Sequence, residues 1–294
     1  MNCIRSKISI IICEILLSSI TICYSFSTSP FQKNTNRVEG IKGQDDTFDI
    51  FVKMRAGVGN GRGANDIVFW TGEGELYESP SGKMVAKVDG VEVSKACYLN
   101  KDHVRVFSRK IFWYRDCETN EIITQYGDMP VKPIKYDWQV FDFERGVNEK
   151  DEFLVPIIPT VVRSPRAPPV MPITPRLAGT TDQLMFQVPV FFDLELPGRG
   201  FYRAWEFYDY FIDTSFATNK PPSLAWTRNG PNPPFINSDC GVMHFHAYRV
   251  NAFDELPEAV QSLVEKNYTL FRTPPTDMEE IDRSILEANN GVSF

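Results

Sequence analysis

The sequence predicts a mainly β fold: an antiparallel barrel or strongly curved sheet, lipocalin-like in broad shape, with two C-terminal helices. Three observations predict this class. Residues 66–117 hold three segments rich in β-branched and aromatic residues, separated only by turn sequences. Further short aromatic segments follow between residues 134 and 250. Helical spacing of apolar residues is found only after residue 254.

The first three strands are expected at 67–78, 84–99 and 103–115, with turns at 79–82 and 100–102. In the third segment neither alternating face is cleanly apolar, so both faces are expected to contact packed or bound groups. The Asp89-Gly90 pair marks either a tight hairpin turn or a bulge inside one long strand. Together these segments predict an antiparallel meander.

Later strands are expected at 134–144, 182–194, 202–212, 224–228 and 242–250. The apolar side of the first of these switches near Val140, which indicates a bulge or a strand buried on both faces. Pro189 places the second at a sheet edge or bends it there. One helix is expected to open at Asp254, and a second follows Pro274-Pro275 with a capping-box pattern that starts at Thr276.

The chain divides into a signal peptide at 1–25, a transit-like or disordered segment at 26–45, and a single β-rich domain at 46–294. Within the domain a strand is expected at 48–55. The Gly-rich stretch at 57–63 predicts a flexible hairpin loop, because its glycines alternate strictly and do not match the dinucleotide fingerprint. The Pro-rich stretch at 154–179 predicts a long loop that crosses the barrel, since aromatic strands resume directly after it.

The leader has two parts. Basic Arg5 and Lys7 precede an apolar run, which is typical of a secretory signal. Glu14 interrupts this run, which is shorter than the roughly 20 residues that a spanning helix needs, so no stable membrane span is expected in the mature chain. The hydroxyl-rich stretch from Phe26, free of acids until Glu39, has transit-peptide composition. This pairing resembles the leader that directs proteins into plastids of secondary origin; the alternative is secretion.

Composition excludes some classes of function. The hydrophobic fraction of 43% supports a sizeable core, and the net charge of −7 argues against a nucleic-acid partner, which selects for a basic face. Three cysteines lie outside the leader, so they cannot all pair within one chain. Cys97 and Cys117 flank the third strand and either form a disulfide or, as we favour, stay free like Cys240.

The sequence HFHAY at 244–248 is the sharpest chemical candidate. In a strand, His244, His246 and Tyr248 share one face, with the two histidines about 6.5–7 Å apart along the backbone. Such a pair can bind one metal ion, take part in acid–base chemistry or serve a structural role. A catalytic metal site also needs a third ligand. The available third ligands are His103, Asp239 and Glu206.

Other candidate residues lie in the aromatic strands. Trp226 and Arg228 precede a proline-rich loop, where Arg228 either holds a carboxylate or phosphate or closes the barrel rim with a salt bridge. Glu206 lies among aromatic residues, where burial would raise its pKa and suit proton transfer; we favour the alternative that it faces solvent. The catalytic candidates are therefore Glu206 and His246. The candidate ligand-binding residues are Arg109, Tyr114, Trp226, Arg228, His244, His246 and Tyr248.

Several segments, taken in order and spacing, resemble one family. They are KMR at 53–55, FWTG at 69–72 with Tyr77, FSRK at 107–110 with Tyr114 and Asp116, SLAWTR at 223–228, FDELP at 253–257, and Tyr268 with Pro274-Pro275. They resemble the domain-of-unknown-function family numbered eighteen thirty-eight, found in bacteria and algae, over residues 53–285. The family has no agreed activity, so the resemblance implies no catalytic role or cofactor. The Gly-rich stretch, the Pro-rich stretch and the leader depart from its pattern.

Three functions follow from these observations. The first is a β-barrel that binds, and could convert, a small largely apolar molecule such as a pigment, lipid or isoprenoid in a plastid, since ligand pockets are apolar with a few placed polar groups. The second is a non-enzymatic interaction or assembly protein, since aromatic residues also fill cores and interfaces. The third is a metal-dependent enzyme that uses His244 and His246.

Overall fold

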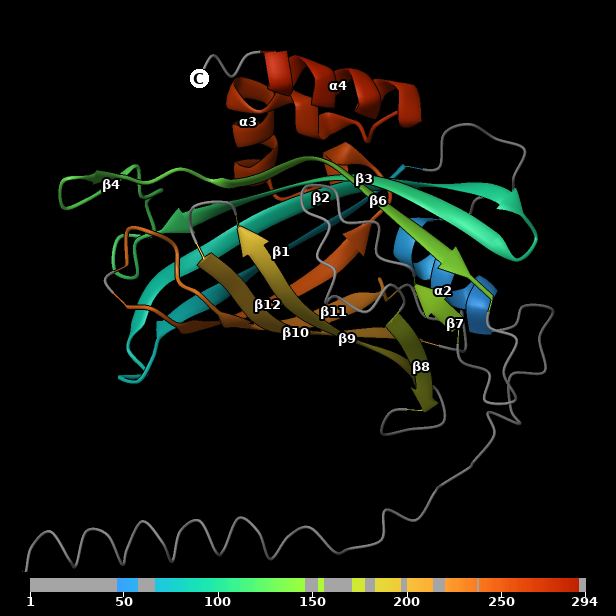
Figure 1. Cartoon of the computed structure of the whole chain (residues 1–294), viewed down its shortest axis with the longest axis horizontal. Helices are drawn as coiled ribbons and strands as arrows, with labels where there is room; N and C mark the ends of the chain where they lie inside the picture. The colour runs from blue at the N-terminus through green and yellow to red at the C-terminus, as the bar shows by residue number, and fades with distance from the viewer. Residues whose placement is uncertain are drawn as a thin grey trace, which may run out of the picture. The chain divides into compact units, whose positions relative to one another are not determined.

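An antiparallel sheet that curls on itself dominates the computed structural model (Figure 1). The structure describes residues 47–57, 67–145, 153–155, 171–177, 183–196, 200–213, 220–236 and 238–290. The leader, most of the Gly-rich stretch and most of the Pro-rich stretch lie outside these residues. The described strands of the barrel are β1 (Ile67–Glu78), β2 (Met84–Asn100), β3 (His103–Arg115), β6 (Ile134–Glu144), β7 (Phe153–Val155), β8 (Met171–Leu177), β9 (Gln183–Leu196), β10 (Gly200–Asp213), β11 (Ser223–Gly230) and β12 (Gly241–Val250).

The strand order closes into a ring: β1-β12-β11-β10-β9-β8-β7-β6-β3-β2, with antiparallel pairing throughout. The predicted antiparallel barrel is therefore confirmed. The long loop expected at 154–179 is wrong in its described parts, because residues 154–155 and 171–177 belong to β7 and β8, which pair with each other in the ring. A separate small hairpin, β4 (Gln125–Tyr126) with β5 (Met129–Pro130), projects from one side (Figure 1). Most neighbours in the ring are also neighbours in the sequence, as in a meander; the exceptions are the closing pair β1–β12 and the pair β3–β6, between which the small hairpin is inserted.

The closure is uneven around the ring. β6 pairs with β7 at only one position, Glu144 with Leu154, so residues 134–143 have β3 as their only partner strand among the described residues. On the other side, β8 reaches only to Gln187 of β9, and residues 188–196 pair with β10 alone within the described chain. Pro189 lies in this stretch, which confirms its expected place at a sheet edge. We call these two strand edges, each without a second partner strand among the described residues, the seam.

β2 passes through Asp89-Gly90 without a turn or a register shift, so the expectation of a hairpin there is wrong, and so is that of a bulge. Packing explains the glycine instead. A Cβ atom at Gly90 would lie 2.2 Å from Cδ1 of Phe112, whose ring covers this position inside the barrel. The bulge expected near Val140 is found in the β3–β6 pairing, where the register shifts between Ser108 and Lys110.

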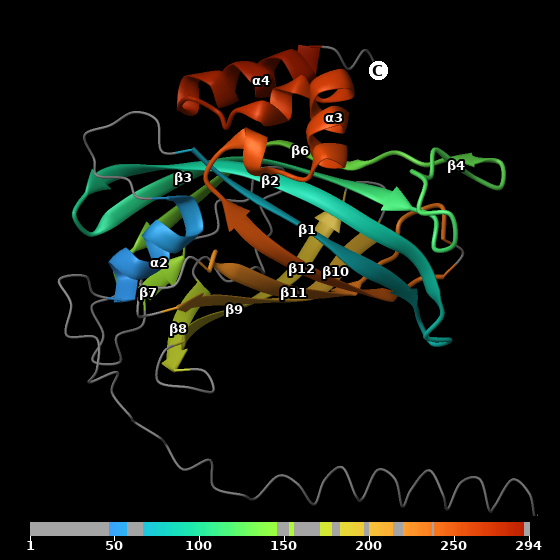
Figure 2. The ribbon, with the colours of Figure 1, turned by 180° about the vertical axis from the view of Figure 1, so that it is seen from behind.

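The strand expected at 48–55 is wrong, because these residues form the helix α2 (Thr47–Ala56). The helix lies at one end of the barrel (Figures 1 and 2), and its apolar residues join the main core. Its C-terminal carbonyls accept hydrogen bonds from two residues of the barrel: Arg249 donates to Lys53 and Met54 (2.5 and 3.0 Å), and Trp70 donates to Arg55 (3.0 Å). A cation at this end also complements the helix dipole.

The C-terminal elements cover the outer face of the sheet (Figures 1 and 2). They are η1 (Phe253–Glu255), α3 (Glu258–Asn267), η2 (Thr269–Arg272) and α4 (Met278–Asn290). The two predicted helices are confirmed, although the first begins after Pro257 rather than at Asp254. Val260, Val264 and Phe271 pack on apolar side chains of β1, β2 and β3, including Ile111 and Trp113. The wall β1-β2-β3 is thus buried on both sides, as the two mixed faces of the 103–115 segment predicted.

We expect α2 to be essential for stability. Phe51 is buried and makes edge contacts with Phe143, Phe186 and Tyr210 at ring-centroid distances of 5.2, 5.2 and 5.7 Å. Phe51→Ala should lower the free energy of unfolding by about 3–5 kcal/mol, because it leaves a cavity among these rings. Phe51→Leu, which keeps most of the volume, should cost less than half as much. Urea denaturation measures both; equal, small losses would contradict the buried position of α2.

Candidate functional site

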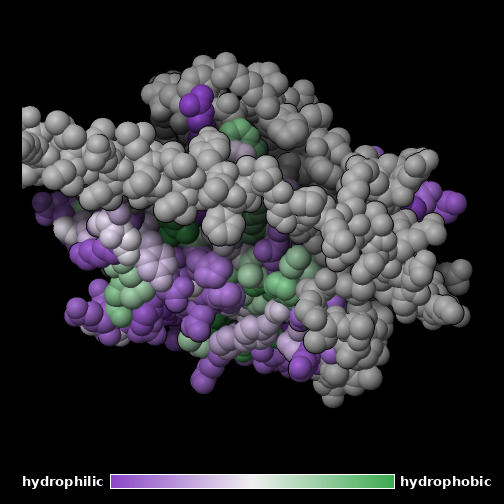
Figure 3. Space-filling model, turned by 90° about the horizontal axis from the view of Figure 1, so that it is seen from below, coloured by the Kyte–Doolittle hydropathy of each residue, from purple (hydrophilic) through white to green (hydrophobic). Residues whose placement is uncertain are grey.

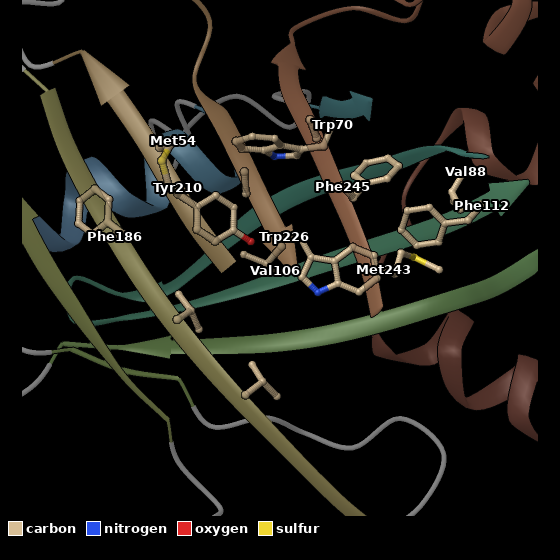
Figure 4. Close-up of a cluster of buried hydrophobic side chains, with 14 of the residues drawn as sticks. Met54, Trp70, Val88, Val106, Phe112, Phe186, Tyr210, Trp226, Met243 and Phe245 are labelled. Carbon is tan, nitrogen blue, oxygen red and sulfur yellow. The ribbon is translucent and has the colours of Figure 1, made fainter. Parts of the chain in front are cut away.

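The inner face of the barrel carries an aromatic lining. Phe112 of β3, Trp226 of β11 and Phe245 of β12 come from three strands and meet inside (Figure 4). The ring of Phe112 stacks on Trp226 at 5.7 Å between centroids and meets Phe245 edge-on at 5.4 Å. Tyr208 of β10 stacks on the other side of the group, 5.8 Å from Trp226. Phe112, Trp226 and Phe245 are buried members of the main core and pack on one another.

A carboxylate lies against this lining. Glu206 of β10 points inward, and its side chain is 8% exposed. Its Oε2 atom accepts hydrogen bonds from the Tyr208 hydroxyl (2.5 Å) and the Trp226 indole (3.1 Å). Arg228, its cross-strand neighbour on β11, brings Nε to 3.7 Å from Oε1. The favoured expectation that Glu206 faces solvent is therefore wrong: its carboxyl group is buried, accepts two hydrogen bonds and lies beside a guanidinium group.

Tyr136 of β6 faces this group across the interior. Partial burial and the charge of Glu206 raise the pKa of Tyr136, and the charge of Arg228 lowers it. Both charges act on the phenol, so it lies within electrostatic range of the pair. The residue is nevertheless 38% exposed, because it lies beside the seam. Burial, followed by the charge and hydrogen bond of Glu206, raises the pKa of Tyr208 well above its usual value, so this phenol stays a donor at neutral pH.

A second polar group lies deeper, beside α2. Arg55 forms an ion pair with Glu92 of β2 and donates a 3.4 Å hydrogen bond to Ser94. Burial opposes the ionised form of Glu92, but the charges of Arg55 and Lys110 outweigh it and lower the pKa of the carboxyl. Burial raises the pKa of Tyr210 to about 12, with Glu92 adding to the shift and Arg55 opposing it.

Lys110 lies between the two polar groups. It is the cross-strand neighbour of Glu92 on β2 and of Tyr136 on β6. Its ammonium nitrogen lies 4.9 Å from the ring centroid of Tyr136 and 5.7 Å from that of Phe112. Both distances are within the range of cation–π attraction. Lys110 is half-buried. It lies between the buried ring of Phe112 and the exposed ring of Tyr136.

The structure separates the predicted site residues by face. Trp226, Arg228 and Glu206 come together inside. Tyr114 also points inward, but it is buried against Phe235 at 4.9 Å. Arg109 points outward, where it donates to the carbonyls of Asp137 (2.8 Å) and Thr273 (2.6 Å) and pairs with Glu280. Arg109 therefore fastens α4 to the sheet.

His244, His246 and Tyr248 share a face, as predicted, but it is the outer face, since Met243, Phe245 and Ala247 are the buried residues of β12. The two imidazole rings meet edge-on at 4.5 Å. Nδ1 of His244 is hydrogen-bonded to the Thr227 hydroxyl (2.8 Å), and His246 is exposed.

Neither histidine reaches the inner site. His103, at the start of β3, lies beside Asp142 (3.6 Å), and Asp239 lies in the loop before β12. In the part of the chain that the structure describes, no group of three or more histidine, cysteine, aspartate or glutamate side chains is placed to hold a metal ion. The described cysteines Cys97, Cys117 and Cys240 are free.

Sequence reasoning gave no role to several members of the inner group, among them Glu92 and five residues around it or the Glu206–Arg228 pair. Three of them carried a usable signal: Lys110 is two residues before Phe112, and Tyr208 and Tyr210 alternate with the outward residues of β10. Tyr136 lies in the expected strand at 134–144 but was given no role. Arg55 had no signal, because its helix was read as a strand.

Comparison with known proteins adds no family: no protein-family model matches the chain, and no curated protein matches it either. Among the described helices, none is long and apolar enough to cross a membrane. The site must therefore be interpreted from its own chemistry.

We expect Tyr210 to titrate as a buried phenol. Because its folded pKa is about 12, above the unfolded value of 10, the stability that its neutral form contributes is complete below pH 10 and is lost as the pH rises toward 12. Alkaline titration of tyrosinate absorbance should show one phenol near pH 12 that Tyr210→Phe removes. In guanidinium the same phenol should titrate near 10. A wild-type-minus-variant difference centred near 10 in the folded protein would contradict the burial.

Proposed function

We propose that the barrel binds a small, largely apolar molecule, such as a pigment, lipid or isoprenoid, with its polar end at Tyr136, on the side of the Glu206–Arg228 pair. The observation that carries the proposal is a charged, hydrogen-bonded group inside an aromatic barrel, beside a seam at which Tyr136 stays exposed. Apolar walls with a few placed polar groups are the usual composition of ligand sites.

Stability alone does not account for this arrangement. Burying ions costs desolvation energy, and replacing a buried ion pair by well-packed apolar residues is often neutral or stabilising. The barrel nevertheless holds Arg55 with Glu92 and Arg228 with Glu206 on its inner face. A role in ligand recognition would explain why these buried ion pairs are present, which packing alone does not explain.

The setting that we propose is a plastid, on the strength of the two-part leader; secretion is the alternative. The resemblance to the family numbered eighteen thirty-eight belongs to the same proposal and implies no reaction. Any conversion of the ligand would use Glu206 as proton acceptor and Tyr208 as donor, since these are hydrogen-bonded at the aromatic lining. His246 lies on the other side of the sheet and has no part in it.

The test is direct binding of palmitic acid, phytol and β-carotene to the purified protein. At a free concentration about a hundred times Kd, a bound ligand should stabilise the fold by about 2.7 kcal/mol, visible as a thermal shift. Trp226→Ala should weaken binding by about tenfold or more, because it removes the central ring of the lining. Trp205→Ala is the matched control: Trp205 lies outside and is 55% exposed, so affinity should not change. No shift with any probe would refute the proposal.

A second candidate, an interaction or assembly protein, is favoured by the outer face of β9 and β10. Trp205 and Phe207 are 55% and 40% exposed, and Phe191 packs against Trp205 at 4.6 Å. We call Phe191, Trp205 and Phe207 the aromatic patch. Figure 3 views the molecule from below, the side of these strands in Figure 1, and shows hydrophobic residues among hydrophilic ones. Exposed aromatic groups of this kind mark interfaces.

If the aromatic patch is an interface between copies of the chain, the wild type should sediment as an oligomer at micromolar concentration. Phe207→Ser combined with Trp205→Ser should return it to the monomer, since an apolar contact is lost on both sides. Ligand binding should survive this change. A wild type that is monomeric at all concentrations would remove self-association as the role of the patch.

A further inference from the structure

The charges on the inner face do not balance. The inward-pointing carboxylates of the described strands are Glu92 and Glu206, and the inward cations are Arg55, Lys110, Arg228 and Arg249. Arg55 is paired with Glu92, and Arg228 with Glu206. Arg249 is held by the carbonyls of Lys53 and Met54 at the end of α2. The ammonium of Lys110 is the one of these four cations that has neither a carboxylate nor a carbonyl partner among the described residues.

No carboxylate among the described residues lies within ion-pair distance of Lys110. Glu92, directly opposite on β2, binds Arg55 with its Oε1 atom, and the charge of Lys110 reaches it only at longer range. The ammonium rests instead on the rings of Phe112 and Tyr136. Cation–π contacts are worth about 0.5–2 kcal/mol and leave the three N–H donors of the ammonium open for an acceptor.

The position of Lys110 matches the entrance of the proposed site. Tyr136, its cross-strand neighbour, is exposed at the seam, and Phe112, under the ammonium, belongs to the aromatic lining with Trp226. A molecule that lies along Phe112 and Trp226 would therefore bring its outer end to the ammonium and the phenol. Both groups donate hydrogen bonds, and one of them carries a positive charge.

We propose that the ligand is an amphipathic anion: an apolar chain or ring system that ends in a carboxylate, held by Lys110 and Tyr136 while its body lies on the aromatic lining. This inference rests on the proposed function and adds the charge of the ligand to it. The chain as a whole carries −7, so the positive charge inside the barrel also guides the anion to the seam rather than to the outer surface.

The experiment compares two probes that differ only in their end group, palmitic acid and 1-hexadecanol, by isothermal titration or competition with a fluorescent fatty acid. The wild type should bind the acid about tenfold more tightly than the alcohol, because a charge-assisted hydrogen bond replaces a neutral one. Lys110→Met should weaken binding of the acid to the level of the alcohol and leave the alcohol unchanged. Lys110→Arg should keep most of the preference.

Lys135→Met is the control, since Lys135 is exposed on the neighbouring strand position of β6. It should bind both probes as the wild type does. If the wild type binds acid and alcohol equally, the inference is overturned and the proposed function stands. If Lys110→Met binds the acid as tightly as the wild type does, the inference is likewise overturned and the proposed function stands. If neither probe nor phytol nor β-carotene binds, the proposed function itself fails. The comparison of probes in the wild type needs no variant, so misfolding of Lys110→Met leaves the question decidable.

Discussion

Insertion of α2 into one end of the barrel is the constraint on which the rest of this structure depends. The helix closes that end with apolar residues on almost all its sides, and Arg249 and Trp70 satisfy its C-terminal carbonyls from the barrel wall. It also brings Arg55 into the interior, where the guanidinium fixes the ionised state of Glu92. Without the helix, Glu92 would be an unpaired anion among apolar side chains, which is costly.

The inner and outer faces of the sheet have different roles. On the outer face, α3, η2 and α4 cover the wall β1-β2-β3, and Arg109 holds α4 in place. Because these elements bury the outer side chains of the wall, the stability of the wall does not depend on its inner side chains alone. Charged residues such as Lys110 can stay there, because the outer packing supplies apolar burial that the inner face gives up.

Much of the fold was predictable from the sequence, and the reasons are local. The segments around Val68, Val93 and Ile111 combine β-branched residues with clear turns, so the predicted bounds of these strands agree closely with the structure. The helix α2 was not, because it is buried on most sides and shows no amphipathic period; its Phe and Val residues suit a strand equally well.

The candidate site was only partly predictable, for a related reason. Alternation shows which residues share a face but not which face is inside. For β12 the apolar set Met243, Phe245 and Ala247 marked the inner side, whereas the ionisable set with His244 and His246 drew attention to the outer one. For β3 both sets contain apolar and charged residues, so Arg109 and Lys110 were indistinguishable until α4 was seen on one side.

The seam has a mechanical consequence. Along 134–143 of β6 and 188–196 of β9, one side of the strand makes no ladder hydrogen bonds to other described strands, so these edges can part without breaking the meander. The wall that carries Trp226, Phe245 and Phe112 is, by contrast, paired continuously from β10 through β11, β12, β1 and β2 to β3. If the barrel binds a ligand as proposed, entry between these two strand edges would leave the hydrogen bonds of the meander intact.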